Sequence, residues 1–387
     1  MRFITGPRQC GKTTLARQKL DLEKTSGLYY LWDRRDVRER YKNNELFFTE
    51  DTLPIGGPLW VCFDEIHKYP KWKNVLKAIF DSTQEKYRFI ITGSAKFDMF
   101  KRAGDSLAGR YFTFHLFPLS IGELEGASNS HPPNENPVSF VESRMAASPF
   151  PEEGLEKLLH FSGFPEPFLH GTTRFMARWS QDYLDRVVSE DIGALTRIID
   201  REYLIDLYRL IPEMVGSPLS VASLAGHIEL SPQTIKNHLR RMEDFYLLFR
   251  IQPYAKNIKR SLLKAPKVYL FDWTRVPDPG LRYENWMACE LLSLTRYWEE
   301  SMGIPFRLHY IRTKDREETD FLILRQNKPW VLVESKLSDG SVASHHLATQ
   351  SQLGGIPFVQ VCRQKGVASL AGKNAYRISA SRFFSQS

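Results

Sequence analysis

The stretch that most constrains the fold of this chain is a glycine-containing loop near its start, residues 6–14, which matches the pattern G-x-x-x-x-G-K-T. A short apolar strand at 3–5 leads into the loop, and a helix beginning near Lys12 and running toward Leu20 leads out of it. Glycine lets the backbone curl closely round a triphosphate, and the helix amino terminus adds unpaired N–H donors. The strand–loop–helix order therefore predicts a phosphate-binding loop rather than a chance match.

Every residue of this loop is assigned to holding ATP. Lys12 is expected to contact the β- and γ-phosphates, and the Thr13 hydroxyl is expected to ligate Mg²⁺. The nucleotide-binding residues are Gly6, Pro7, Arg8, Gln9, Cys10, Gly11, Lys12, Thr13 and Thr14. Lys12 is also assigned to catalysis, because its charge offsets the charge of the phosphates during transfer.

A strand that ends in two acids follows about fifty residues later. Residues 59–63 are apolar and run into Asp64 and Glu65, the pattern of a buried parallel strand with acids at its carboxyl tip, where α/β sheets bind ligands. Asp64 is expected to hold Mg²⁺ together with Thr13, and Glu65 to polarise the attacking water. The pair predicts the Walker B strand of an ATPase.

Two further polar residues are candidates for the same site. Ser94 follows the apolar strand 88–93, where ATPases of this class carry a side chain that contacts the γ-phosphate or the water; the alternative is a turn at a strand end. Arg110 is a candidate finger or sensor that stabilises transition-state charge, and the alternative is a surface charge. Both are assigned to catalysis with Lys12 and Glu65.

These motifs together resemble one family, the prokaryotic AAA-type ATP-binding proteins with a carboxyl-terminal domain of unknown function. The segments that carry the resemblance lie at 6–14, 63–66, 91–94, 107–110, 117–120, 162–166, 182–184 and 266–272. The resemblance implies ATP binding and hydrolysis by an α/β core, which we place at 1–125. One departure is that the first strand begins almost at Met1, where family members usually have a further segment that helps to hold the adenine.

The middle of the chain is expected to contain a linker, a helical connector and a winged helix-turn-helix. Residues 126–150 are rich in Ser, Pro and Asn and predict the linker. A helical pattern predicts the connector at 151–217. The winged helix-turn-helix is expected at 218–272, because a short helix at 221–228 precedes a turn and a second helix that starts with Ser231 as its N-cap.

The second helix of that motif predicts contact with DNA. Lys236, Arg240 and Arg241 fall largely away from its apolar face and are assigned to DNA binding. From 232 to 267 the chain has nine Lys or Arg against two acids, a net charge of about +7. The wing lysines assigned to the same surface are Lys256, Lys259 and Lys264. The alternative is a lid or protein-docking module, because winged helices in ATPases often serve in that way.

A hairpin near the carboxyl terminus carries a second constellation. Strands at 319–324 and 330–336 are symmetrical about Asn327. That symmetry places Asp320 opposite Glu334 across the hairpin, and predicts that the two carboxylates lie within reach of one shared cation. Like charges so close together predict a raised pKa for at least one of them.

Together with Lys336 and Glu284, this hairpin resembles the core of PD-(D/E)XK nucleases, in which the acids bind Mg²⁺ and the lysine positions the water. Lys336 supplies the lysine, and Glu284 on a preceding helix is expected to join the two acids as a second metal site. Thr319 stands where the motif has proline, so the match is partial. The resemblance implies a nuclease-like domain at 273–387, and the alternative is a set of charged residues on an edge hairpin.

Composition restricts the setting of these sites. The net charge of +8 permits a nucleic-acid partner. No stretch approaches the ~20 apolar residues that span a bilayer, and the chain begins directly with a strand, so neither a membrane partner nor a leader is expected. The four cysteines are far apart in the sequence and suggest neither a zinc site nor disulfides, which predicts a cytoplasmic location.

The predicted fold is α/β, an AAA-type core followed by a helical connector, a winged helix and a nuclease-like domain. The leading function is Mg²⁺-dependent ATP hydrolysis coupled to a DNA-associated carboxyl-terminal module. Two alternatives stay open: a nucleotide-switched DNA-binding or protein-docking regulator with little turnover, and an ATP-gated nuclease. The oligomeric state is left open.

Overall fold

The chain divides into two compact units. The computed structural model describes residues 1–52, 57–69, 71–83, 86–94, 107, 109–124, 133, 135–193, 198–255, 265–313 and 315–385, with the backbone alone at 198–200. Unit 1 consists of Met1–Phe117 with Asp244–Tyr246, and unit 2 of Pro118–Glu243 with Leu247–Ser387. The wing lysines Lys256, Lys259 and Lys264 lie outside the described residues, as does part of the expected linker.

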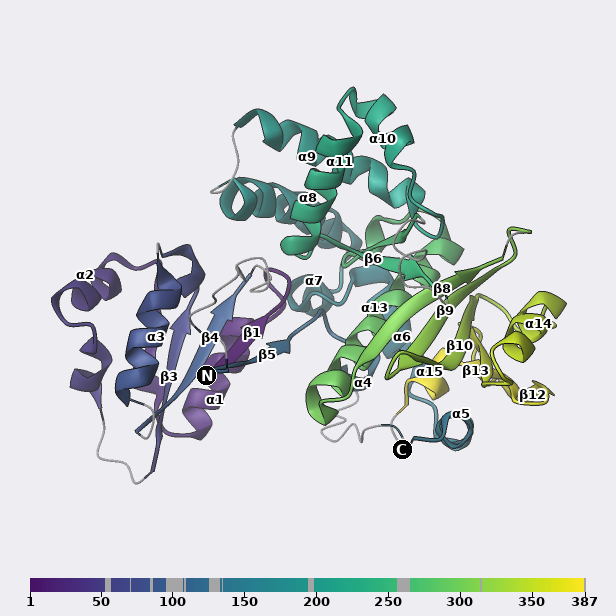
Figure 1. The fold of residues 1–387 in the computed structure, drawn as a ribbon, viewed down its shortest axis with the longest axis horizontal. Coiled ribbons are helices and arrows are strands. Elements are labelled where there is room, and N and C mark those ends of the chain that lie inside the picture. Colours follow the sequence, from purple (N-terminus) through teal and green to yellow (C-terminus); the bar gives the residue numbers. More distant parts are fainter. Residues whose placement is uncertain are drawn as a thin grey trace. The chain divides into compact units, whose positions relative to one another are not determined.

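Unit 1 is built on a parallel five-stranded sheet (Figure 1). Its strands are β1 (Arg2–Thr5), β2 (Tyr29–Leu31), β3 (Leu59–Asp64), β4 (Tyr87–Gly93) and β5 (Phe112–His115), in the order β2-β3-β4-β1-β5. Thr5 pairs with Gly93, and Asp64 pairs with Thr92. The carboxyl ends of β1, β3 and β4 therefore meet at one edge, where ligands bind in sheets of this kind.

Helices cover both faces of that sheet. On one face α1 (Lys12–Leu22) packs Ala16 and Leu20 against Trp60, Cys62 and Ile90. The other face carries α2 (Arg35–Asn43) and α3 (Trp72–Thr83). The apolar residues of α3 lie at helical spacing: Trp72, Val75, Leu76 and Ile79 are buried, and Phe80 is half-buried. Short 3₁₀ turns lie at Ser26–Leu28, Phe47–Asp51 and Ile66–Lys68.

Unit 2 begins with helices. They are α4 (Ile121–Leu124), α5 (Pro137–Ala146), α6 (Glu152–Phe161), α7 (Pro165–His170), α8 (Thr173–Arg186), a π-helical turn (Val187–Ile192), α9 (Ile198–Leu210), α10 (Val221–Ile228) and α11 (Pro232–Asp244). Further 3₁₀ turns lie at Ile211–Met214 and Trp273–Arg275, and α13 (Pro279–Met302), α14 (Ser344–Gln352) and α15 (Ala380–Phe383) follow. No helix among the residues that the structure describes is long and apolar enough to cross a membrane.

The expectation of a linker at 126–150 is wrong for its second half, where α5 forms. The Asn136 side chain accepts hydrogen bonds from the first turn of α5, and Pro137 stands at its first position, where proline is favourable. Phe140 then packs against Trp298 and Trp330, with ring centroids 5.4 and 4.8 Å away. These aromatic partners are distant in the sequence. Packing against them stabilises a helix in a segment whose composition is typical of a loop.

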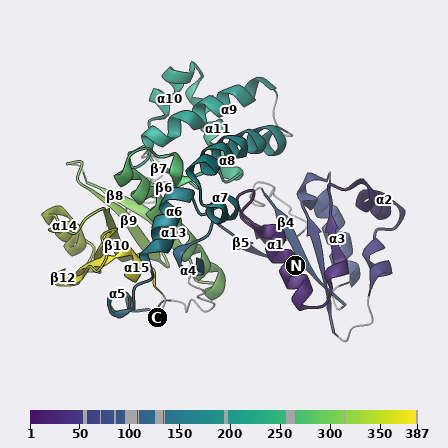
Figure 2. The same cartoon turned by 180° about the vertical axis from the view of Figure 1, so that it is seen from behind.

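An eight-stranded mixed sheet forms the rest of unit 2. Its strands are β6 (Leu248–Pro253), β7 (Lys267–Leu270), β8 (Phe306–Arg312), β9 (Glu318–Arg325), β10 (Lys328–Lys336), β11 (Phe358–Cys362), β12 (Ala368–Gly372) and β13 (Ala375–Ser379). Their order is β12-β13-β11-β10-β9-β8-β6-β7, and Figure 2 shows β12 and β7 at the two ends.

Strands β6 and β7, which lie within the range expected for the winged helix-turn-helix, belong to this same sheet. They pair with each other antiparallel, and β6 also pairs with β8 through Gln252↔His309 and Pro253↔Tyr310. The sheet therefore crosses the expected boundary between 218–272 and 273–387.

The helix pair before these strands forms as the sequence predicts. Ser231 Oγ accepts a hydrogen bond from the backbone N–H of Thr234 at 3.1 Å, so Ser231 caps α11, which begins at Pro232. Ile235, Leu239 and Met242 are buried, as the apolar spacing of α11 indicates.

Candidate functional site

The loop between β1 and α1 has the backbone geometry that only glycine accepts at its two ends. Gly6 has φ +154°, and a Cβ placed there would lie 1.9 Å from the carbonyl oxygen of Leu116. Gly11 has φ +99° and immediately precedes α1. The first helical N–H groups therefore open into the loop, the arrangement by which a helix amino terminus binds phosphate.

Lys12 turns its ammonium group back into the loop. Its Nζ donates to the carbonyl oxygens of Gly6 at 3.0 Å and Pro7 at 2.6 Å, and the side chain is buried. The charge that would neutralise a phosphate is thus already inside the loop, held by carbonyl oxygens that a phosphate oxygen could replace as acceptor.

Asp64 stands at the centre of a group of hydroxyls at the carboxyl edge of the sheet. Thr13 Oγ1 donates to Asp64 Oδ2 at 2.9 Å, and the hydroxyls of Tyr29 and Thr92 also donate to this carboxylate. Burial and the Asp64 charge raise the pKa of Tyr29, which therefore stays protonated and able to donate. The sequence pointed to Thr13 and Asp64 as partners but missed Tyr29 and Thr92.

Glu65 follows Asp64 in a left-handed conformation, with φ +58°. Its Oε2 lies 3.6 Å from His67 Nε2 and 3.5 Å from Lys68 Nζ. Burial raises the pKa of Glu65, and the charge of Lys68 acts in the opposite direction. The carboxylate is therefore poised to change protonation above the usual range of glutamate, and a cation lies beside it.

Several buried polar atoms at this edge of the sheet have no hydrogen-bond partner within the described part of the chain. Among them are the Ser94 hydroxyl, which follows β4, Gln9 Oε1, which lies in the loop, and Glu65 Oε2. Ser94 comes directly after Gly93, the partner of Thr5, so it stands beside the start of the loop. Buried polar groups are normally satisfied, and these positions fit a bound Mg²⁺·triphosphate.

The remaining loop residues frame the site. Cys10 Sγ donates to the carbonyl oxygen of Leu116 at 3.2 Å, which ties the loop to the end of β5. Thr14 is exposed at the start of α1, and Arg8 is half-buried.

Arg110 is not brought to this site. It precedes β5, and because Arg2 pairs with Phe112, it lies at the amino edge of the sheet, opposite the loop. Its guanidinium forms a two-pronged ion pair with Asp81 of α3, at 2.8 and 3.2 Å. Within unit 1 the arginine therefore braces α3 rather than facing the nucleotide loop.

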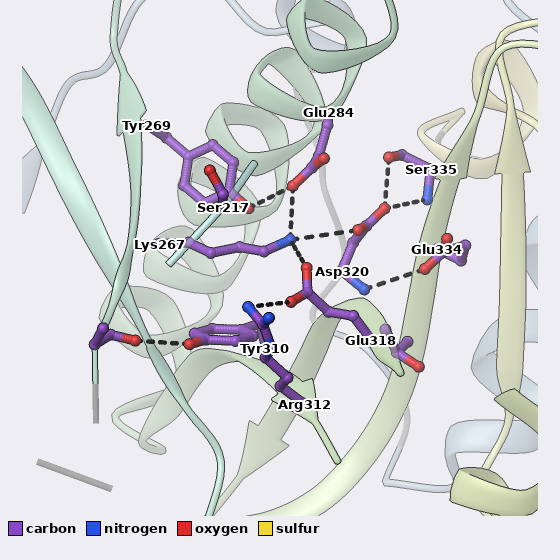
Figure 3. A network of polar contacts seen from close by, with 12 residues as sticks. Ser217, Lys267, Tyr269, Glu284, Tyr310, Arg312, Glu318, Asp320, Glu334 and Ser335 are labelled. Atoms are coloured by element: carbon purple, nitrogen blue, oxygen red, sulfur yellow. Dashed lines mark hydrogen bonds and ion pairs between the residues drawn. The ribbon is translucent and has the colours of Figure 1, made fainter. Parts of the chain in front are cut away.

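A second group of polar residues lies in unit 2 and is called here the acid–lysine cluster: Lys267, Glu284, Glu318, Asp320, Glu334 and Lys336. Figure 3 shows the first five of these residues. The hairpin register Val333↔Phe321 agrees with the symmetry about Asn327. Glu334 Oε2 accepts a hydrogen bond from the backbone N–H of Asp320 at 3.1 Å. The structure thus gathers the four residues predicted from the sequence and adds Lys267 and Glu318.

The carboxylates of the hairpin face different lysines, and the shared cation expected between them stays a prediction. Asp320 Oδ1 lies 3.5 Å from Lys267 Nζ, whereas Glu334 Oε1 lies 2.6 Å from Lys336 Nζ. Among the described residues, no group of three or more His, Cys, Asp or Glu is arranged to hold a metal ion. Burial, and secondarily the charge of Asp320, raises the pKa of Glu284 and of Glu334, in the predicted direction.

The basic surface predicted for DNA is smaller than the sequence suggests. Lys236 and Arg240 are exposed on α11, and Arg241 is half-buried. Arg250 forms an ion pair with Glu243 at 2.5 Å, and the side chain of Lys267 is 0% exposed. The net charge of about +7 included Arg250 and Lys267, and neither is free to face DNA. Successive side chains of a strand point to opposite faces of a sheet, so some of them point into the protein.

Two protein-family models match parts of the chain. A family model described as an AAA domain matches residues 1–125, and a domain of unknown function matches residues 152–274. With the parallel sheet and its loop, the first match supports a P-loop AAA-type ATPase core in unit 1.

The curated relatives are uncharacterized proteins. One from Mycobacterium tuberculosis and one from Mycobacterium bovis are each 23% identical over 357 residues, which is 88% of this chain and 71% of the relative. Among solved structures, a Bacillus subtilis DNA clamp loader delta protein matches with a TM-score of 0.26 and 10% identity, over 77% of this chain and 95% of that one. Such a low score carries no argument about fold or function.

Proposed function

We propose that this protein binds ATP with Mg²⁺ at its amino-terminal loop and hydrolyses it, and that the nucleotide state is coupled to a DNA-associated unit 2. One observation carries the ATPase part: the Thr13 hydroxyl at the start of α1 donates to the Asp64 carboxylate at 2.9 Å. A hydroxyl and a carboxylate side by side supply the oxygen ligands that Mg²⁺ prefers. The lysine and the helix amino terminus beside them supply the positive charge that a triphosphate needs.

Each residue at this site then has a defined task. Mg²⁺, when bound, neutralises charge on the phosphoryl group that is transferred. Lys12 exchanges the loop carbonyls for phosphate oxygens, while Thr13 and Asp64 provide oxygen ligands. Glu65 accepts a hydrogen bond from the attacking water and orients it, and the Ser94 hydroxyl is positioned to contact the γ-phosphate or that water.

Removal of the metal tests the proposal on the wild-type chain. ATP with Mg²⁺ is expected to raise the midpoint of thermal unfolding, because a ligand at ~100 times its Kd stabilises the folded state by about 2.7 kcal/mol. Phosphate release should require Mg²⁺ and stop when EDTA is added. A folded protein that shows neither the shift nor phosphate release would refute the proposal.

A second candidate function is a nucleotide-dependent switch with little turnover. It is favoured by the position of Glu65, whose Oε2 lies 3.5 Å from Lys68 and 3.6 Å from His67. Contacts to those side chains compete with contact to a water, so hydrolysis would be slow until Glu65 is released. Tight ATP binding with negligible phosphate release in a folded protein would identify this function.

The DNA-associated part of the proposal is supported by α11. Its start is fixed by the Ser231 cap, its apolar side is buried, and Lys236 and Arg240 are exposed one turn apart. A helix that presents cations in this way fits DNA phosphates. Protein docking through the same helix is the alternative.

Charge reversal on α11 is expected to weaken duplex DNA binding. Each phosphate contact contributes about 0.9 to the slope of log affinity against log salt, so Lys236→Glu with Arg240→Glu should reduce that slope by roughly 2. Fluorescence anisotropy with a short duplex across a salt series measures it.

The matched control is Arg174→Glu with Arg178→Glu, which makes the same change of charge at the same spacing on exposed positions of α8. Only the α11 pair should reduce affinity. Equal effects of the two pairs, or no duplex binding at low salt, would assign α11 to protein contacts.

A further inference from the structure

We propose that the ammonium group of Lys267 takes the place of a divalent cation in the acid–lysine cluster, so that Glu284, Glu318 and Asp320 clamp β7 to α13 and β9 instead of binding a catalytic metal. All residues of the cluster belong to unit 2. An ATP-gated nuclease would need a metal ion at these carboxylates, so a lysine in that place argues against nuclease activity.

The number and direction of the contacts favour an ammonium ion at this position. Lys267 Nζ lies 3.0 Å from Glu284 Oε1, 2.5 Å from Glu318 Oε1 and 3.5 Å from Asp320 Oδ1 (Figure 3). A lysine ammonium has three N–H donors, and these oxygens provide one acceptor for each. The side chain of Lys267 is 0% exposed, so its charge is compensated by these carboxylates and not by water.

The other oxygen contacts of the carboxylates are also made by the protein. Asp320 Oδ2 accepts hydrogen bonds from the backbone N–H and the hydroxyl of Ser335, at 3.0 and 2.7 Å. Glu284 Oε1 accepts a further hydrogen bond from Tyr269 at 2.8 Å. Mg²⁺ requires oxygen ligands at about 2.0–2.1 Å in octahedral geometry, and these oxygens are already oriented toward N–H and O–H donors.

The clamp acts where the sheet is held by few backbone pairs. The β6–β7 hairpin joins the other strands through Gln252↔His309 and Pro253↔Tyr310. Lys267 adds a tie from β7 to β9, and Asn285 of α13 bonds the backbone N–H and carbonyl of Leu270 at 2.9 and 2.7 Å. Three residues join α11, which carries Lys236 and Arg240, to β6, and β6 pairs with the clamped strand β7.

Metal binding by the cluster provides a direct test. Asp64→Asn in every sample removes the candidate carboxylate ligand of unit 1, and Mn²⁺ binding is measured by electron paramagnetic resonance. The protein that retains Lys267 is expected to bind no Mn²⁺ through the cluster. Mn²⁺ binding that is lost on Glu284→Gln with Asp320→Asn would overturn the proposal. Lys267 is unchanged in all proteins of this experiment.

The substitution Lys267→Met keeps the apolar stem and removes the ammonium. It is expected to lower the thermal midpoint without metal and to create a Mn²⁺ site that restores several degrees. Addition of Asp320→Asn should abolish the Mn²⁺ response, and Lys328→Met, at an exposed position of β10, should have neither effect. A folded Lys267→Met protein that gains no Mn²⁺ affinity would contradict the proposal, as would Mg²⁺-dependent plasmid cleavage that is lost on Asp320→Asn.

Discussion

The substitution Lys12→Ala is expected to abolish ATP binding while the protein stays folded. The ammonium of Lys12 is buried in the loop and donates to the carbonyl oxygens of Gly6 and Pro7. In the complex the same charge would contact phosphate oxygens, and hydrogen bonds between charged groups are roughly twice as strong as neutral ones. Alanine provides neither the charge nor a donor, so the loop would face the triphosphate without a lysine.

The loss of binding must be distinguished from a loss of stability. Without the ammonium, two carbonyl oxygens of the loop lose a donor, which costs on the order of 1–3 kcal/mol if they stay buried. The thermal midpoint of Lys12→Ala without ligand should therefore fall somewhat, and addition of ATP·Mg²⁺ should not raise it. Isothermal titration calorimetry measures the binding directly.

Lys19→Ala is the matched control, because it makes the same substitution on the same helix. Lys19 pairs with Glu23 in a partly exposed ion pair two turns along α1, and such pairs contribute only about 0–1 kcal/mol. It should bind ATP as the wild type does. Undiminished calorimetric binding by Lys12→Ala would mean that the nucleotide binds elsewhere.

The elements of the nucleotide site that could be predicted from the sequence are those that depend on neighbouring residues. The loop and its helix are contiguous, and Asp64 with Glu65 directly follows an apolar strand. Tyr29 and Thr92 were missed because their contact with Asp64 depends on the order β2-β3-β4, which joins residues 35 and 28 positions apart. Strand order is a tertiary property, and a tyrosine in a short strand is more often simply core.

In unit 2, likewise, the hairpin depends on neighbouring residues, whereas the cluster around it depends on tertiary structure. The register about Asn327 is local and was predicted correctly. Lys267 was misassigned because a count of charges does not reveal burial: it lies 53 residues from Asp320, and only the pairing of sheet strands and α13 brings the two together. A lysine at the start of the otherwise apolar segment 267–271 was the signal available in the sequence.

The substitution Glu65→Gln is expected to preserve ATP binding and to reduce turnover by about 10²–10⁴-fold, the usual contribution of a positioned acid–base group. Glutamine keeps the size of the side chain but cannot accept a proton from the attacking water. The interaction lost is one made in the transition state, so kcat should fall while the affinity for ATP stays similar. Glu39→Gln, at an exposed position of α2, is the control and should leave turnover unchanged.

The pH profile of the wild type adds a second measurement for the same carboxyl group. Burial raises the pKa of Glu65, and the ionised form is the one that can orient and deprotonate water. The ionised fraction falls as the pH drops through this raised pKa, so turnover should decline at a pH above the ~4.3 of an ordinary glutamate. In Glu65→Gln that acidic limb should disappear from the residual activity. A Glu65→Gln protein that keeps both wild-type turnover and the same acidic limb would show that another group is the base.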